Sequence, residues 1–284
     1  MSIIDSKTLK PQKEYDNNEL KELARKIRAY SIISITAAGS GHTGGVMSVA
    51  DIATVLYFKI SNHDPKAPDW DGRDRVFWSA GHKAPALYAA LGLAGYFDLE
   101  KTVRLRKLDS GFEGHPNRFK LAGIECSSGS LGQGLGVAVG SALRAFIDSR
   151  DYRVFCIMGD GELNEGSVWE AAMSASHHGL DNLVGIIDRN NLQIDGFTKD
   201  IMNTEPIIEK WQSFGWEVIE IDGHDFDQID PAIKKAISMK DKPVCIVANT
   251  IKGKGVSFME NQCDWHGKAP SREEREKALS DLTG

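Results

Sequence analysis

The sequence predicts an α/β fold, a doubly wound and mostly parallel sheet with helices on both faces. Three apolar runs, at 154–158, 183–187 and 244–248, have the length and composition of buried strands. Segments with the apolar spacing of helices separate these runs, and such alternation is typical of parallel sheets joined by crossover helices. With 284 residues and 41% hydrophobic content, the chain is long enough to bury a substantial core.

The chain shows no internal repeat and no low-complexity linker, so we expect a single domain over 1–284. Residues 1–17 are polar, and we expect them to form an extended N-terminal arm. Apolar residues at helical spacing then predict a helix over 18–38, which Gly39 ends.

A second helix is predicted over 48–60, where Ser48 and Asp51 have the spacing of a capping box. The other elements expected before residue 150 are a strand at 76–78, a helix that runs to residue 93, a glycine-serine loop at 127–136 and a helix from that loop to about residue 147.

The stretch 154–196 has the pattern of a βαβ unit, in which a strand ends at a Gly-Asp-Gly turn before a helix and a second strand. Asp160 and Asn190 each follow a strand, and the carboxyl ends of parallel strands lie on one edge of the sheet. We therefore expect the two side chains to meet where open α/β sheets bind ligands. Their oxygens suit magnesium or calcium, and the flanking glycines allow a phosphate to approach the backbone. A GDG turn alone often merely ends a strand, but GDG, NEG and NN in this order favour a site.

The last third of the chain continues the alternation. Pro231 lacks a backbone donor, so we expect it in the first turn of its helix or at a new start. The expected elements are a helix at 204–214, a strand at 216–221, a helix at 225–238, the strand at 244–248, a loop at 250–267 and a C-terminal segment, 268–284, with a charged helix over 271–282.

Composition narrows the class of protein. The net charge of −6 argues weakly against a nucleic-acid partner. The four cysteines show no CxxC spacing, which favours a reducing cytoplasm without structural disulfides or a zinc site. We find neither a signal-peptide core nor an apolar run of membrane-spanning length, so we expect a cytoplasmic protein without membrane association.

Four of the eight histidines lie in loops beside glycine: His42, His82, His115 and His266. Histidine near neutral pH can donate to phosphate, move a proton or stabilise an oxyanion. For any single one of these histidines, the simplest explanation is a role in capping or at the surface. Together, at the ends of elements, they are expected to converge on the ligand edge of the sheet. The other four, His63, His177, His178 and His224, have no functional assignment from the sequence.

These motifs resemble the transketolase family. GDG followed about thirty residues later by NN is similar to the diphosphate-magnesium motif of thiamine-diphosphate enzymes. The strings GDGELNEGSVWEAA and IDRNNLQIDG, with SGHTG, GHP and HGKAP, resemble transketolases in particular. The resemblance implies that Asp160, the Asn190 side chain and the Leu192 carbonyl hold Mg²⁺, with Ca²⁺ or Mn²⁺ as possible substitutes, against the cofactor diphosphate.

The same resemblance implies roles for further residues. His115 would contact hydroxyls of the donor sugar, while His42 and His266 would assist proton movement and hold the acceptor aldehyde. Glu165 would join these as part of an acidic cluster at a subunit interface near the cofactor. The implied cofactor contacts are His82, Gly129, Ser130, Leu131, Gly159, Asp160, Gly161, Glu162, Asn190 and His266.

Two positions depart from the family pattern. Thr43 and Ser130 stand where many members have proline. Both lie in expected loops, so we expect altered rigidity or substrate preference rather than lost chemistry.

The resemblance covers about 18–270, less than half of a full transketolase. The family's pyrimidine-binding domain supplies a glutamate that activates the cofactor and arginines that grip the substrate phosphate, and we expect both on another chain. This implies the N-terminal subunit of a split transketolase, which would form a heterotetramer with a C-terminal subunit. It would transfer a two-carbon ketol unit between sugar phosphates or sulfonated or branched sugars. Two alternatives stay open: the alpha subunit of a 2-oxoacid dehydrogenase or a related thiamine enzyme, and a non-catalytic thiamine-diphosphate-binding module.

Overall fold

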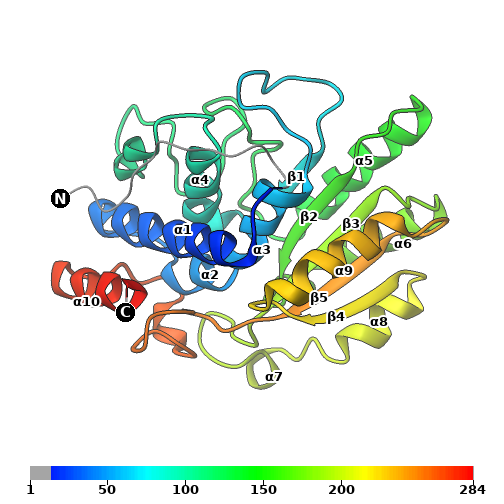
Figure 1. The fold of residues 1–284 in the computed structure, drawn as a ribbon. Helices are drawn as coiled ribbons and strands as arrows, with labels where there is room; N and C mark the ends of the chain where they lie inside the picture. The colour runs from blue at the N-terminus through cyan, green and yellow to red at the C-terminus, as the bar shows by residue number, and fades with distance from the viewer. Residues whose placement is uncertain (1–13, 284) are drawn as a thin grey trace.

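Five parallel strands form one sheet in the order β1-β2-β3-β5-β4 (Figure 1). The computed structural model describes residues 14–283, so most of the predicted arm lies outside the described residues. The parallel sheet with helices on both faces confirms the predicted fold class. The strands are β1 (Arg75–Trp78), β2 (Val154–Gly159), β3 (Leu183–Arg189), β4 (Glu217–Asp222) and β5 (Val244–Asn249).

Helices cover the two faces of the sheet and enclose two apolar cores. Strand β2 contributes to both, because successive side chains of a strand point to opposite faces. Phe155 and Ile157 pack in the larger core, whereas Cys156 and Met158 pack in the smaller one. The larger core is covered by α1 (Asn17–Ala38), α2 (Thr43–Ser48), α3 (Ala50–Val55), α4 (Ala84–Leu93) and α9 (Phe226–Ser238), and the smaller by α5 (Gln133–Ile147), α6 (Gly166–His177) and α8 (Ile207–Ser213).

Local sequence signals account for the limits of α1. Asp16 accepts hydrogen bonds from the backbone amides of Asn18 and Glu19, and the Glu19 carboxylate accepts one from the Asp16 amide. This capping box satisfies amides that the first turn leaves without partners. The helix ends at Gly39, whose φ of 68° is left-handed and favours glycine. The C-terminal helix α10 (Arg272–Thr283) packs against α1 (Figure 1).

The helix predicted over 48–60 is wrong in its start and its continuity. The chain is already helical from Thr43, and it forms α2, α3 and then a π-helical turn at Leu56–Ile60. The capping box predicted for Ser48 and Asp51 does not form. Tertiary partners recruit both side chains instead, since Ser48 donates to Asp188 and Asp51 accepts from Arg28.

Smaller differences concern the later helices. Pro231 lies inside α9 rather than in its first turn. Its position is exposed, so water can bond to the helix carbonyl that would otherwise accept from a backbone amide at residue 231. Helix α5 begins within the predicted glycine-serine loop, and α7 (Thr198–Ile201) was not predicted. No helix of the described chain is both long and apolar enough to cross a membrane.

The two-sided core yields a prediction for stability. Ile157 in β2 is fully buried, whereas Ile147 at the end of α5 is 70% exposed. We expect Ile157→Ala to lower the free energy of unfolding by about 2–5 kcal/mol, because it removes buried methyl groups and leaves a cavity. Ile147→Ala, the matched control, is expected to stay within about 0.5 kcal/mol of the wild type. Urea denaturation followed by circular dichroism measures both, and equal losses would contradict this account of the core.

Candidate functional site

A cavity of about 270 Å³ opens among the loops that follow the carboxyl ends of β2, β3 and β5. This is the edge of the sheet at which a ligand site was expected. Twelve residues predicted from the sequence line it: His42, His82, His115, Gly129, Leu131, Gly159, Asp160, Gly161, Glu162, Asn190, Leu192 and His266.

The four glycine-flanked histidines meet in this cavity. The His42 ring centroid lies 5.1 Å from that of His82, 6.2 Å from that of His115 and 5.5 Å from that of His266. The centroids of His82 and His266 are 5.6 Å apart. Loops from both ends of the chain therefore bring four imidazoles within reach of one ligand.

These imidazoles are neutral near pH 7. Burial is the main cause, and it lowers the pKa of His42 to about 4 and that of His266 to about 3. Burial and then the Lys83 ammonium hold the pKa of His82 well below its ordinary value, and burial with Arg106 lowers the pKa of His115. A neutral imidazole has one donor and one acceptor nitrogen, so each ring can hold a hydroxyl or take up a proton.

His42 carries a further indication of a ligand. Its Nδ1 atom is buried and has no hydrogen-bond partner in the described part of the chain. Buried polar atoms are normally satisfied, and an exception that faces a cavity favours a role in ligand binding.

Asp160 and Asn190 tie two strand ends together. The Asp160 carboxylate accepts from the Gly161 amide at 2.9 Å and from the Asn191 amide at 2.6 Å. The Asn190 side-chain oxygen accepts from the Leu192 amide at 3.2 Å. Asn191 has a left-handed φ of 62°, which turns the chain sharply after β3. Asp160, Asn190 and Leu192 thereby face one cavity from two loops.

The donor set fits a hard divalent cation with few protein ligands. Among the described residues, no three His, Cys, Asp or Glu side chains converge to hold a metal ion. A cation at Asp160 would therefore take one carboxylate, with amide, carbonyl, water and phosphate oxygens for the rest, as magnesium prefers. Burial, and then the neighbouring Asp188 charge, raise the pKa of Asp160 to about 6. A positive charge in the cavity would relieve this cost.

Two lysines that were not predicted from the sequence bring ammonium groups to the cavity, beside the Asp160 and Glu162 carboxylates. Lys83 donates to Asp188 at 2.6 Å in a fully buried ion pair. The Lys252 ammonium lies 2.8 Å from His266 Nδ1 and donates to the Gln193 carbonyl at 3.3 Å. Burial lowers the pKa of Lys252 to about 8. The position of Lys252 in the sequence could have predicted its place in the site, because Lys252 closely follows β5 as Asp160 follows β2.

Other unpredicted residues complete the lining. Gly45 comes from α2, and Gln193 and Ile194 come from the loop after β3. Ile194 is 67% exposed, so the cavity mouth on this side is apolar and open.

Two predicted site residues, Ser130 and Glu165, do not line the cavity, and a third, Glu162, lines it but has its carboxylate held by neighbouring loops. The Glu162 carboxylate is buried, accepts from Ser79 and the amides of Gly132 and Gly159, and so holds the glycine loop against the GDG turn. Ser130 is exposed and lines a neighbouring hollow that shares Gly129 with the cavity, but it does not line the cavity itself. Glu165 is exposed at the start of α6 and does not line the cavity in the described chain.

Thr43, which stands where the family pattern has proline, begins α2 rather than lying in a loop as expected, and it links this helix to the loop after His266. Its hydroxyl donates to the Lys268 carbonyl at 2.6 Å. Thr43 adjoins His42, and Lys268 lies two residues beyond His266, so this bond helps to fix both histidines.

Comparisons with known proteins point to one family. The sequence matches the family described as transketolase, thiamine diphosphate binding domain, over residues 20–282. It is 41% identical to a 6-deoxy-6-sulfo-D-fructose transketolase subunit of Clostridium sp. (strain MSTE9), covering 93% of this chain and 96% of that protein. It is also 41% identical to an apulose-4-phosphate transketolase subunit of Actinobacillus succinogenes, with the same coverage. The crystal structure of Campylobacter jejuni transketolase superposes with a TM-score of 0.90 at 35% identity, over 95% of this chain but 43% of that one.

The buried Asp160 charge predicts an unusual pH dependence. Its pKa in the folded protein, about 6, exceeds the ordinary 3.8, so the folded state binds the extra proton between these values. The free energy of unfolding therefore rises as Asp160 takes up this proton between about pH 6 and pH 4. At pH 7 the carboxylate is charged and buried, and it destabilises the folded state. In buffer with EDTA at pH 7, we expect Asp160→Asn to raise the free energy of unfolding by about 1–3 kcal/mol.

Urea denaturation of both proteins from pH 4 to 8 measures this effect. The difference between variant and wild type isolates Asp160 from other groups that titrate in the same range. An Asp160→Asn variant that is less stable than the wild type at pH 7 without divalent cations would contradict the raised pKa of Asp160.

Proposed function

Since this chain belongs to the transketolase family, as its thiamine diphosphate-binding domain, we propose that it is the N-terminal subunit of a two-chain transketolase. The proposal rests on the share of each relative's length that this chain covers. Separate transketolase subunits are covered over 96% of their length, whereas the Campylobacter jejuni transketolase chain is covered over only 43%. The enzyme would transfer a two-carbon ketol unit between sugar phosphates or related modified sugars.

The cavity suits the diphosphate end of the cofactor. Asp160, Asn190 and the Leu192 carbonyl would hold Mg²⁺, and Ca²⁺ or Mn²⁺ could replace it. His82, His266 and the Lys252 ammonium would donate to the diphosphate oxygens, as charge-assisted donors do. When bound, thiamine diphosphate supplies an electron sink for cleaving a carbon–carbon bond beside a carbonyl.

The histidines would handle the sugars. As neutral imidazoles, His42 and His115 can each hold a substrate hydroxyl, with His115 assigned to the donor sugar. His42 and His266 would hold the acceptor aldehyde and move a proton at its oxygen. The low pKa of His42 and its unpaired Nδ1 leave it a lone pair near pH 7, whereas His266, whose Nδ1 faces the Lys252 ammonium, would act through Nε2 as a donor. This division of roles follows the family resemblance together with the shared cavity.

The partner chain would complete the site. We propose a C-terminal subunit that carries the pyrimidine-binding domain, in a heterotetramer with two copies of each chain. The cavity volume of about 270 Å³ lies just below the range of roughly 300–1,000 Å³ that is typical of small-molecule pockets. Glu165, exposed beside the GDG loop, is our candidate for contact with a neighbouring chain. A cytoplasmic location would suit the four free cysteines.

The substrate class follows the relatives named for modified sugars. A ketose with a terminal sulfonate or phosphate, or a branched ketose phosphate, would fit relatives named for 6-deoxy-6-sulfo-D-fructose and apulose 4-phosphate. We assign the choice among these to the partner chain, which would carry the groups that grip the anion.

Cofactor binding by the full chain is the first test. Isothermal titration calorimetry should detect thiamine diphosphate binding with magnesium and a large loss of affinity with EDTA. We expect Asp160→Ala to weaken binding by roughly a hundredfold or more, because it removes the only carboxylate proposed for the metal. The exposed His178→Ala is the control and should bind like the wild type. Equal affinity with and without magnesium would refute the metal assignment.

Ketol transfer after mixing is the second test. The purified chain alone should be inactive, and activity should appear with its C-terminal partner on 6-deoxy-6-sulfo-D-fructose, apulose 4-phosphate or a plain ketose phosphate. We expect His115→Ala to lower kcat/KM of the complex by about 10²–10⁴-fold while cofactor affinity changes little. Full activity of this chain alone would exclude the two-chain enzyme. Cofactor binding without ketol transfer in the presence of the partner would favour a non-catalytic binding module, and an unchanged kcat/KM in His115→Ala would exclude the role assigned to His115.

A further inference from the structure

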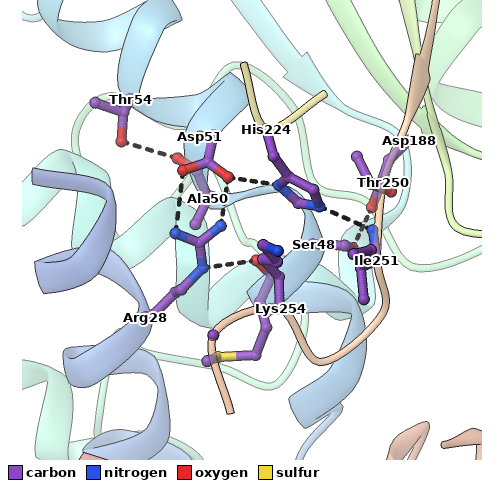
Figure 2. Close-up of polar contacts among 12 residues, drawn as sticks. Arg28, Ser48, Ala50, Asp51, Thr54, Asp188, His224, Thr250, Ile251 and Lys254 are labelled. Carbon is purple, nitrogen blue, oxygen red and sulfur yellow. Dashed lines mark hydrogen bonds and ion pairs between the residues drawn. The ribbon is translucent and has the colours of Figure 1, made fainter. Parts of the chain in front are cut away.

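A buried polar chain connects α1 to the loop after β5, outside the cavity. Arg28 in α1 donates to both carboxylate oxygens of Asp51 in α3. His224, in the loop after β4, has its Nδ1 atom 2.7 Å from Asp51 Oδ2. Figure 2 shows the Asp51 carboxylate between the Arg28 guanidinium and the His224 ring. Burial opposes the Asp51 charge, but Arg28 and His224 hold the pKa of Asp51 below its ordinary value.

The two neighbours of His224 fix its tautomer. Its Nε2 atom lies 2.8 Å from the backbone nitrogen of Ile251, which is always a donor. The Nε2 atom must therefore accept, so the ring proton is on Nδ1 and is donated to Asp51. The His224 side chain is only 12% exposed, and water cannot readily replace either bond.

The Ile251 amide belongs to a loop that is held by hydrogen bonds before and after Ile251. The Thr250 hydroxyl donates to Asp188, and the Thr250 amide donates to the Arg189 carbonyl at 2.9 Å. The Gly253 amide donates to the Gly44 carbonyl at 3.0 Å. Between these anchors, the Ile251 amide donates to the His224 ring.

Close packing joins the loops after β4 and β5. A Cβ atom at Gly223 would lie 2.5 Å from Cγ2 of Thr250, so only glycine permits this approach. The adjacent His224 is thereby brought onto the Ile251 amide.

The anchored loop ends at the cavity. Lys252 follows Ile251, is 1% exposed and sends its ammonium to His266 and the Gln193 carbonyl. A long lysine side chain loses much conformational freedom when held in this way. Fixing its backbone in advance reduces the entropy that binding must otherwise remove.

We propose that His224 is a positioning residue of the cofactor site, which orients Lys252 toward the diphosphate by accepting the Ile251 amide. The inference rests on the proposed function, since it takes the anionic ligand of Lys252 to be a diphosphate. His224 itself does not line the cavity and would touch neither cofactor nor substrate.

Two amide substitutions separate the two bonds of His224. His224→Gln places an acceptor near Nε2 and can keep the Ile251 bond, whereas His224→Asn can keep a donor for Asp51 but cannot reach Ile251. By NMR hydrogen exchange on the full chain without ligand, the Ile251 amide should exchange roughly tenfold faster in His224→Asn than in the wild type. His224→Gln should restore most of the protection.

Binding of inorganic pyrophosphate with magnesium, measured by calorimetry, then tests the link to Lys252. We expect His224→Asn to weaken binding by roughly five- to tenfold and His224→Gln by less than about threefold. In a Lys252→Met background, His224→Asn should cost little more, because the group through which it acts is already gone. The exposed His178→Asn is the matched control and should behave like the wild type.

The outcomes distinguish this inference from the proposed function. A wild-type chain that binds neither pyrophosphate nor thiamine diphosphate with magnesium would overturn the proposed function. Binding by the wild type with equal losses in His224→Asn and His224→Gln, or with an undiminished loss in the Lys252→Met background, would overturn the positioning role alone. An Ile251 amide that exchanges freely in the wild type would also overturn it.

Discussion

One buried carboxylate, Asp188, holds the site together. It lies fully buried in β3 and accepts from Lys83, Ser48 and Thr250, which come from three other segments. Removing either charge from such a pair leaves the other buried and unpaired, which typically costs several kcal/mol. The segments that carry His82, Gly45 and Lys252 are thus all bound to Asp188, and the geometry of the cavity depends on these bonds.

Desolvation then sets the chemistry of the cavity. The same burial that keeps the histidines neutral disfavours the Asp160 charge and lowers the pKa of Lys252 to about 8. A ligand that carries both a metal ion and a diphosphate would satisfy all of these groups at once. Neutral imidazoles, a carboxylate short of positive charge and a cavity lysine are therefore one arrangement rather than separate features.

The sequence was sufficient for the elements with strong local signals. The apolar runs became β2, β3 and β5, and strand-end logic placed Asp160 and Asn190 in one cavity. It failed where tertiary partners outcompete local ones, as for Ser48 and Asp51, whose side chains bind Asp188 and Arg28 instead of capping a helix. Lys83 and Lys252 were missed because lysine is usually exposed, and only the assembled fold reveals their burial. His224 had no sequence signal at all, since its partners come from distant segments.

The contact between His42 and His266 has a consequence for folding during synthesis. The two rings come from opposite ends of the sequence, yet their centroids are 5.5 Å apart. The cavity therefore cannot be complete on a nascent chain until its last loop has emerged and docked. A ligand that needs both rings would stabilise only the finished domain and not its partly synthesised forms. Cofactor capture would thus report that the loop carrying His266 has docked beside His42.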